Sequence, residues 1–303
     1  MAVNGINAIE TSFVKDYGTN IELLVQQIGS VFRPCVYNDS FVGESAAVIE
    51  QVGEVSAQVR ATRHGDTPLV PTPMDRRWCF PTDFELADLI DTQDKLRQII
   101  DPTNMFAQAQ AAALGRSIDD IIIEAILGDN KTGQNAGTTV ALPAAQQIDN
   151  GGTGMTIEKL RTALEKFENA NVDLERENVY AVISPEQKRQ LLSTTEVTNA
   201  DYNTVRALAN GEIDTFLGFK FKTSTRLLGG AFYGGTRTPT ANMQTATFFT
   251  EKGVGLGMWN DISSRIDERA DKSYAWQVYS KGTFGATRLQ EEKVITIETD
   301  KTK

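Results

Sequence analysis

Residues 46–80 carry the pattern that most restricts how this chain can fold. Val55, Ala57, Val59 and Ala61 alternate with polar side chains, as in a β-strand with one apolar face. The segment HGDTP then makes a turn, and the prolines around it place the returning strand at a sheet edge, because proline cannot donate to a ladder. The predicted two-stranded ribbon is marginal in water on its own, so it needs another surface to lie on.

The first 45 residues show little periodic pattern outside IELLVQQI. In that stretch Ile21, Leu24, Val25 and Ile28 form one apolar stripe over two helical turns. An arm with one short helix buries too little apolar surface to fold alone. We therefore expect the arm to dock on its own body or on a neighbouring molecule.

Helical patterns follow the ribbon. Thr82 and Glu85 match a capping box, and apolar residues at mostly helical spacing continue to Ile100. Asp101-Pro102 breaks or kinks this predicted helix. The alanine-rich run TNMFAQAQAAALGRSIDDIIIEAIL then continues the helical pattern up to Gly128, a residue suited to the position after a helix.

The central region reads as a compact α/β unit. TIEKLRTALEKFENA predicts an amphipathic helix capped by Thr156, and VYAVISPEQKRQLL predicts a strand running into a second helix. VRALAN predicts a short helix before an Asn-Gly turn, and GFKFKTST predicts a strand after a turn at Leu217-Gly218.

Strand-like alternation dominates the final third of the chain. Its candidates for burial are Tyr274, Trp276, Val278 and Phe284. These strands must pair with strands or helices from earlier in the chain.

Ser184 stands between the strand and the helix of VYAVISPEQKRQLL, where it is either a nucleophile or a cap. A hydrolase nucleophile elbow needs glycines on both sides, whereas valine, isoleucine, proline and glutamate flank this serine. The capping interpretation uses every residue, with Pro185 at N1 and Gln187 at N3 completing a capping box. The sequence favours the cap.

Composition limits the function classes. The chain has 30 Lys and Arg against 40 Asp and Glu, a net charge of −10, which argues against tight nonspecific binding to phosphate backbones. No basic start followed by an apolar core is present, and no apolar stretch approaches the twenty residues of a bilayer span. We expect a cytosolic, soluble protein that does not associate with a membrane.

Few residues are available for metal or cofactor chemistry. Cys35 and Cys79 are far apart and are expected to be free structural thiols, and His64 is the sole histidine, which excludes a His-rich metal site. The glycine-rich segments in residues 129–155 do not have the spacing of a phosphate-binding loop, so a flexible surface loop is expected there. No catalytic residue, cofactor or metal is indicated.

Three motifs carry a resemblance over nearly the whole chain: AVISPEQKRQLL, GFKFKTST and KGTFGATRLQEEKVITIE. Their order, after an arm, a ribbon and a long helix, resembles the major capsid proteins of tailed bacteriophages, which have the Hong Kong 97 type of shell fold. The resemblance implies an α+β Hong Kong 97-like fold. It would comprise an N-terminal arm (1–45), an extended E-loop (46–84), a spine helix with the first part of a peripheral domain (85–155), an axial domain (156–254) and a return to the peripheral domain (255–303).

The resemblance implies a structural, non-enzymatic protein whose pentamers and hexamers close into an icosahedral shell around the phage genome, without sequence-specific DNA binding. Its location would be the virion, after assembly in the host cytoplasm. A built-in charged scaffold segment is absent, which implies a separate scaffolding protein, beside a portal and, as an optional partner, a decoration protein. The alternatives are an encapsulin-like nanocompartment shell protein and a cytosolic hydrolase that uses Ser184.

The predicted E-loop also supplies candidate inter-subunit contacts, which are Arg60, Arg63, His64, Asp66, Arg76 and Arg77. On an exposed ribbon these residues could pair with acids on the adjacent subunit, and simple solvation is the alternative. A lysine-to-asparagine crosslink, known in some members of the family, is not expected, because the segment 46–84 contains no lysine.

Overall fold

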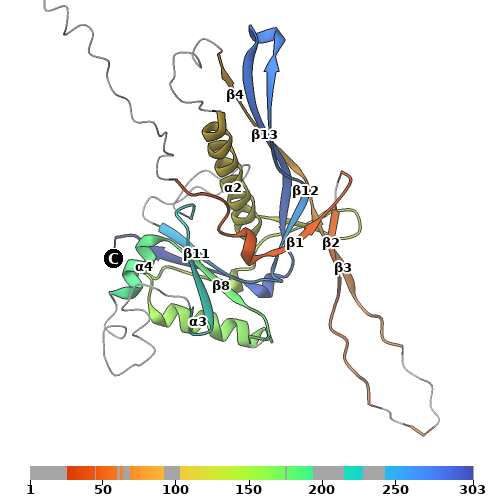
Figure 1. The fold of residues 1–303 in the computed structure, drawn as a ribbon. Helices are drawn as coiled ribbons and strands as arrows, with labels where there is room; N and C mark the ends of the chain where they lie inside the picture. Colours follow the sequence, from red (N-terminus) through yellow and green to blue (C-terminus); the bar gives the residue numbers. More distant parts are fainter. Residues whose placement is uncertain are drawn as a thin grey trace, which may run out of the picture.

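The computed structural model describes residues 26–44, 46–59, 62–63, 69–91, 103–174, 176–193, 215–227 and 243–302. Figure 1 shows a compact lower body, an upright sheet lying along a long helix, and a ribbon that projects away from both. The helices of the described residues are α2 (Thr103–Leu127), α3 (Ile157–Asn169) and α4 (Pro185–Leu192).

Three sheets organise the described strands. The upright hairpin sheet has the order β1 (Tyr37–Ser40), β12 (Val254–Arg269), β13 (Ala275–Arg288), β4 (Thr82–Ile90). The body sheet has the order β7 (Gln147–Ile148), β14 (Val294–Asp300), β11 (Met243–Thr250), β8 (Val179–Ile183), β10 (Phe219–Thr223), β9 (Thr215–Phe216). The ribbon sheet has the order β2 (Ala46–Val52), β3 (Met74–Cys79), β5 (Asn130–Thr132), β6 (Thr138–Val140).

The body sheet is buried on both faces. Successive residues of a strand point to opposite sides, so Phe248 joins the core under α3 while Phe249 joins the core that contains α2. On β8, Ala181 and Val182 divide in the same way. This double burial explains why the strand VYAVI is almost continuously apolar rather than alternating.

The hairpin sheet uses α2 to cover one of its faces. The Gln110 side chain on α2 donates to the carbonyl oxygen of Val278 at 3.2 Å and accepts from the hydroxyl of Ser280 at 2.8 Å. Phe84 on β4 stacks on Phe284 on β13 with 5.0 Å between ring centroids. Gly285 follows, and a Cβ there would lie 2.1 Å from the Phe80 carbonyl oxygen, so only glycine fits this close crossing.

Several predictions from the sequence are confirmed. The Ser184 hydroxyl accepts from the Gln187 N–H, and the Gln187 side chain accepts from the Ser184 N–H, which completes the capping box of α4. Thr156 caps α3. Residues 103–127 form one helix that ends before Gly128, and β2 pairs antiparallel with β3 at the base of the predicted ribbon.

Other predictions are wrong. The helix predicted to begin after Thr82 is instead strand β4, which pairs with β13 along its whole length. Its apolar residues also alternate, and pairing with a long neighbouring strand overrides the local helical spacing. Tyr274 is 62% exposed rather than buried, and the glycine-rich loop contains the β5–β6 hairpin. The short helices expected at IELLVQQI and VRALAN lie wholly or mostly outside the described residues.

One buried cation closes the C-terminal end of α2. The last carbonyl groups of a helix have no partner within the helix and attract positive charge. The Arg288 side chain is fully buried, and its Nη1 donates to the carbonyl oxygens of Ile126 and Gly128, each at 3.0 Å. The Asn130 side chain donates to the Ala125 carbonyl oxygen at 2.8 Å and accepts from the Arg288 N–H at 3.1 Å.

Replacement of this cation should be costly. Arg288→Met leaves the last carbonyl groups of α2 without their buried donor and removes one of the two cations beside Glu291, so the free energy of unfolding should fall by about 3–5 kcal/mol. The matched control is Arg176→Met, because Arg176 forms an exposed i,i+3 pair with Asp173, which is worth about 0–1 kcal/mol. Urea unfolding measures both values, and equal midpoints for the two variants would contradict this role for Arg288.

Candidate assembly surface

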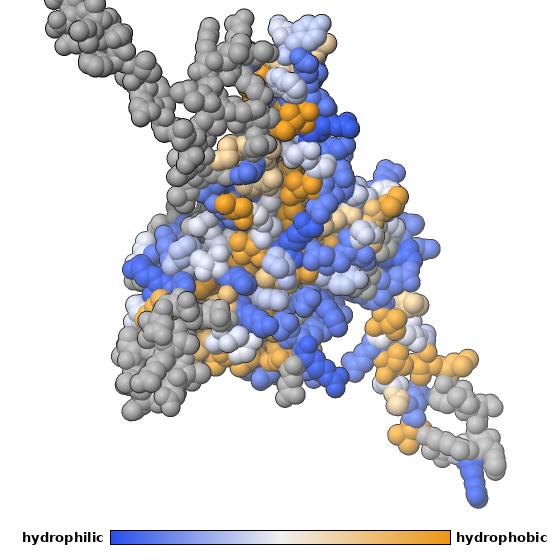
Figure 2. All heavy atoms as spheres, in the orientation of Figure 1, coloured by the Kyte–Doolittle hydropathy of each residue, from blue (hydrophilic) through white to orange (hydrophobic). Residues whose placement is uncertain are grey.

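The ribbon, residues 46–79, projects from the molecule with apolar side chains in solvent. Val59 is 93% exposed and Leu69 is 94% exposed, and Val52, Val55 and Met74 are also exposed. Figure 2 shows apolar residues gathered along the projection. A cluster of exposed apolar residues on a projecting element marks a protein contact surface.

The outer half of the ribbon also has backbone groups that take part in no strand ladder. The β2–β3 ladder ends at the Val52–Met74 pair, and beyond it the Gly53 N–H donates to the Pro73 carbonyl oxygen at 2.8 Å. Residues 54–59 and 69–72 belong to no strand ladder among the described residues. Water or another chain must therefore satisfy their backbone groups.

The base of the ribbon is fixed to the body by a buried ion pair. Arg77 on β3 donates from Nη1 and Nη2 to the two carboxylate oxygens of Glu291, at 2.9 and 2.7 Å. Both side chains are less than 10% exposed. Trp78 donates from Nε1 to the Gly133 carbonyl oxygen at 2.7 Å, so the base is attached to the β5–β6 hairpin as well.

The six residues predicted as inter-subunit contacts have different surroundings. Arg60, His64 and Asp66 lie outside the described residues, and Arg63 is exposed at the outer end of the ribbon. Arg76 forms an ion pair with Glu50 and lies over the Trp78 ring at 5.8 Å. Arg77 is buried, so the expectation that it lies on the exposed surface is wrong, because Glu291 of the same chain binds it.

The end of the N-terminal arm is fixed on α2. Asp119 is fully buried, and its carboxylate accepts from the N–H groups of Val31 and Phe32, each at 3.1 Å, and from the side chains of Gln27 and Ser30. A Cβ on Gly115 would lie 2.9 Å from the Gly29 backbone, so glycine permits this close approach. For residues 26–36 the expectation that the arm docks on its own body is confirmed.

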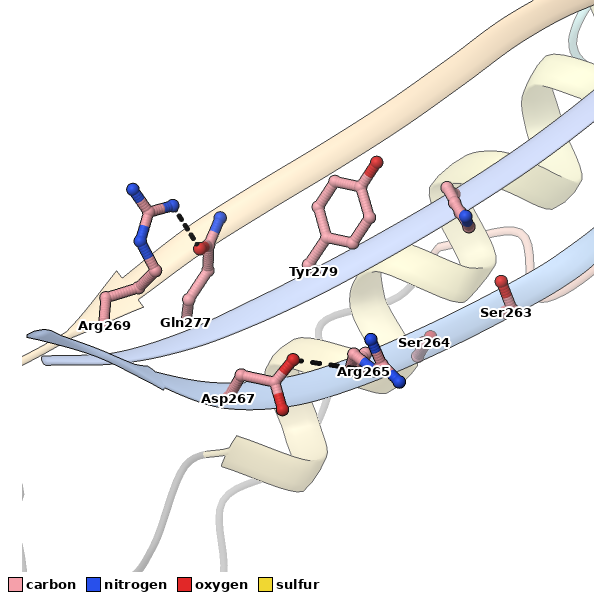
Figure 3. A pocket seen from close by; sticks show the side chains of 8 residues that line it. Ser263, Ser264, Arg265, Asp267, Arg269, Gln277 and Tyr279 are labelled. Carbon is pink, nitrogen blue, oxygen red and sulfur yellow. Dashed lines mark hydrogen bonds and ion pairs between the residues drawn. The ribbon is translucent and has the colours of Figure 1, made fainter.

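A polar groove of about 600 Å³ lies on the hairpin sheet, on the face away from α2 (Figure 3). Arg269 donates to the Gln277 side chain at 2.8 Å and forms an ion pair with Asp271 at 2.6 Å. Arg265 lies 3.6 Å from Asp267. The guanidinium groups are thus neutralised by neighbouring carboxylates, and the groove suits a hydrated protein contact rather than a specific anion.

Ser184 has no access to a substrate. Its side chain is fully buried, and besides its capping bond the hydroxyl donates to the Gln244 side chain at 2.7 Å. A nucleophile must reach a reacting atom and needs an adjacent base, whereas this hydroxyl contacts a backbone amide and a glutamine. The geometry is that of a helix cap.

The titratable groups offer no metal centre within the described part of the chain. No cluster of three His, Cys, Asp or Glu side chains is arranged there to hold an ion. Cys35 and Cys79 are free and buried, and burial raises the pKa of their thiols to about 11 and about 12. Among the described helices, none has the length and apolar character to cross a membrane.

Asp119, Arg288 and Glu291 were not predicted from the sequence. Each one binds a partner far along the chain, such as Arg77 and Glu291, which are 214 positions apart. No local spacing encodes such a pair.

The described parts define a class of protein. They combine a projecting ribbon with exposed apolar side chains, an upright hairpin sheet and a compact α/β body, an arrangement that offers surfaces for contact with other protein molecules. The family model "Phage capsid protein" matches residues 9–301, and the chain belongs to this family. It is a structural protein, and many copies of it form the phage shell.

Solved structures agree with this fold. The capsid of the cyanophage P-SCSP1u has a TM-score of 0.74 at 16% identity, covering 96% of this chain and 94% of that one. The capsid of the cyanophage Pam1 has a TM-score of 0.72 at 14% identity, covering 99% of each chain. The capsid of the Helicobacter pylori bacteriophage KHP30 has a TM-score of 0.71 at 11% identity, again covering 99% of each chain. No curated protein matches the sequence.

The buried thiols give a pH-dependent prediction. Because the thiols ionise less readily in the folded chain than at their ordinary pKa of about 9, their contribution to stability is complete below pH 9 and is lost as the pH rises toward 11 and 12. The free energy of unfolding should fall between pH 9 and 11. Cys35→Ala combined with Cys79→Ala should flatten this slope, and an unchanged slope would contradict the assignment.

The cap gives a second prediction. Ser184→Ala should lower the free energy of unfolding by about 0.5–2 kcal/mol, because it removes the N-cap acceptor of α4. Thr162→Ala, which changes an exposed hydroxyl on α3, is the control and should stay within about 0.5 kcal/mol of the natural chain. Thermal and urea unfolding measure both. A Ser184→Ala chain as stable as the control would argue against the cap.

Proposed function

We propose that this chain is the major capsid protein that forms the icosahedral shell of a tailed phage, and that its ribbon completes itself on a neighbouring subunit. The observation that carries the proposal is the ribbon, whose base is clamped by the buried Arg77–Glu291 pair while its outer half exposes Val59 and Leu69. A ribbon with a rigid base and an exposed apolar outer half is suited to contact between copies of the chain. The family match favours a phage shell over an encapsulin-like compartment.

The proposed shell consists of pentamers and hexamers that assemble in the host cytoplasm around a separate scaffolding protein, with a portal and, as an optional partner, a decoration protein. The net charge of −10 supports a shell that encloses DNA without sequence-specific binding. An acidic surface does not bind phosphate backbones tightly, so the DNA can slide along it. The chain's role is structural, which the buried, cap-forming Ser184 also supports.

We further propose the family's division of the chain. Residues 1–45 would be the arm, 46–84 the E-loop, 85–155 the spine helix with the first part of the peripheral domain, 156–254 the axial domain, and 255–303 the return to the peripheral domain. The two apolar clusters support this division in part, because one lies among α3, α4 and the body sheet and the other around α2.

Electron microscopy with light scattering tests the proposal directly. The purified chain, alone and with a candidate scaffolding protein, should give closed shells, tubes or ring-shaped capsomers. The contents of closed particles separate a virion shell from a protein-filled compartment. A stable monomer under both conditions would contradict the proposed function.

The ribbon can be tested by single substitutions. Leu69→Asp places a charge on a side chain that is 94% exposed, so the fold should be unaffected while the yield of shells falls at least tenfold. Val42→Asp is the control, because Val42 is 99% exposed but lies outside the ribbon. Arg63→Glu tests the predicted charge contact in the same assay. Shell yields equal to the natural chain for both ribbon variants would refute the role of the ribbon.

The shell should be held together without covalent crosslinks. The segment 46–84 contains no lysine that could form an isopeptide bond from the E-loop. Mature particles boiled in detergent should therefore migrate as a single band of 33.3 kDa. A ladder of multimers would contradict this expectation.

A further inference from the structure

A cleft of about 200 Å³ opens at the base of the ribbon, between α2 and the crossover from β3 to β4. Its aromatic wall consists of Trp78 and Phe80, and its helical wall includes Ile121 and Glu124. Small-molecule sites usually have volumes of roughly 300–1,000 Å³. This cleft therefore fits one long side chain better than a metabolite.

The aromatic wall is open to solvent. Phe80 is 48% exposed although it directly follows the buried Cys79. The Trp78 indole is held in place by its bond to the Gly133 carbonyl oxygen, at 2.7 Å. Arg76 of the same chain already lies over the Trp78 ring at 5.8 Å, which is the contact expected between a cation and an electron-rich ring face, and the exposed phenyl ring of Phe80 offers a further such face.

Glu124 is the acidic group of the cleft that has no ion pair among the described residues. Within the described residues, the Glu124 carboxylate has no hydrogen bond or ion pair, and partial burial raises its pKa. Asp129 lies at the rim. Lys131 also lines the cleft, but its ammonium donates to the Thr139 hydroxyl at 2.6 Å and forms no ion pair with Glu124. A partly desolvated carboxylate without a partner is unfavourable until a cation reaches it.

We propose that this cleft is a socket for an arginine or lysine side chain of a second copy of this chain, with Glu124 as its counter-ion and Trp78 and Phe80 as its walls. The inference rests on the proposed assembly, and charge complementarity identifies the occupant. The socket adjoins the clamped base of the ribbon, so a subunit that covers the ribbon also covers the cleft. The socket would bind one side chain of the neighbouring copy beside the apolar contact that the ribbon makes.

Trp78 fluorescence tests whether the socket is covered in the shell. The variant Trp259→Phe/Trp276→Phe leaves Trp78 as the sole tryptophan. On assembly, its emission should shift to shorter wavelength and its quenching by acrylamide should fall at least threefold. Unchanged quenching in shells that microscopy shows to be closed would overturn the proposal, whereas a failure to form any shell would count against the proposed function instead.

A charge reversal tests the nature of the occupant. Glu124→Lys places a cation in the socket and should reduce shell yield at least tenfold, while Glu124→Gln, which keeps the shape, should reduce it less. Glu158→Lys, on the exposed face of α3, is the matched control and should assemble normally. Circular dichroism and thermal unfolding verify that the unassembled variants are folded. Normal assembly of a folded Glu124→Lys chain would overturn the proposal.

Discussion

The fold depends on one chain of buried charges at the end of α2. Arg288 satisfies the terminal carbonyl groups of the helix, lies 3.6 Å from Glu291, and shares that carboxylate with Arg77 at the base of the ribbon. A buried ion group of this kind contributes little net stability over apolar packing, but losing one member is costly. The main effect of these buried charges is to hold α2, the hairpin sheet and the base of the ribbon in fixed positions relative to one another.

The ribbon is fixed at its base, but at its outer end it has exposed groups that a neighbouring subunit could cover. The body buries its sheet on both faces and is complete, whereas the outer ribbon leaves backbone groups and valine and leucine side chains in water. The arm differs, since Asp119 binds its last described residues to α2 of the same chain. In the proposed assembly, the contacts would come from the ribbon and the surfaces beside its base, because the body is already folded within the single subunit.

Local signals in the sequence predicted the local structure. The serine, proline and glutamine of SPEQ encode a complete capping box, and the alternation near Val55 encodes an extended ribbon, because each depends on residues within a few positions. Strand β4 was missed because Leu86, Leu89 and Ile90 fit helical spacing, and only pairing with β13 decides the outcome. The buried charges could not be predicted, since their partners lie far apart in sequence. The family resemblance identified the shell fold, and contact residues remain proposals.

Hydrogen exchange of the ribbon tests the central claim most directly. Backbone amides in residues 54–59 and 69–72 have no ladder partners among the residues that the structure describes, so they should exchange within seconds before assembly. In closed shells a neighbouring subunit should cover them, and their exchange should slow at least tenfold, while amides of α3 remain unchanged. Equal exchange of these segments before and after assembly would show that the ribbon stays in solvent, which would contradict the account.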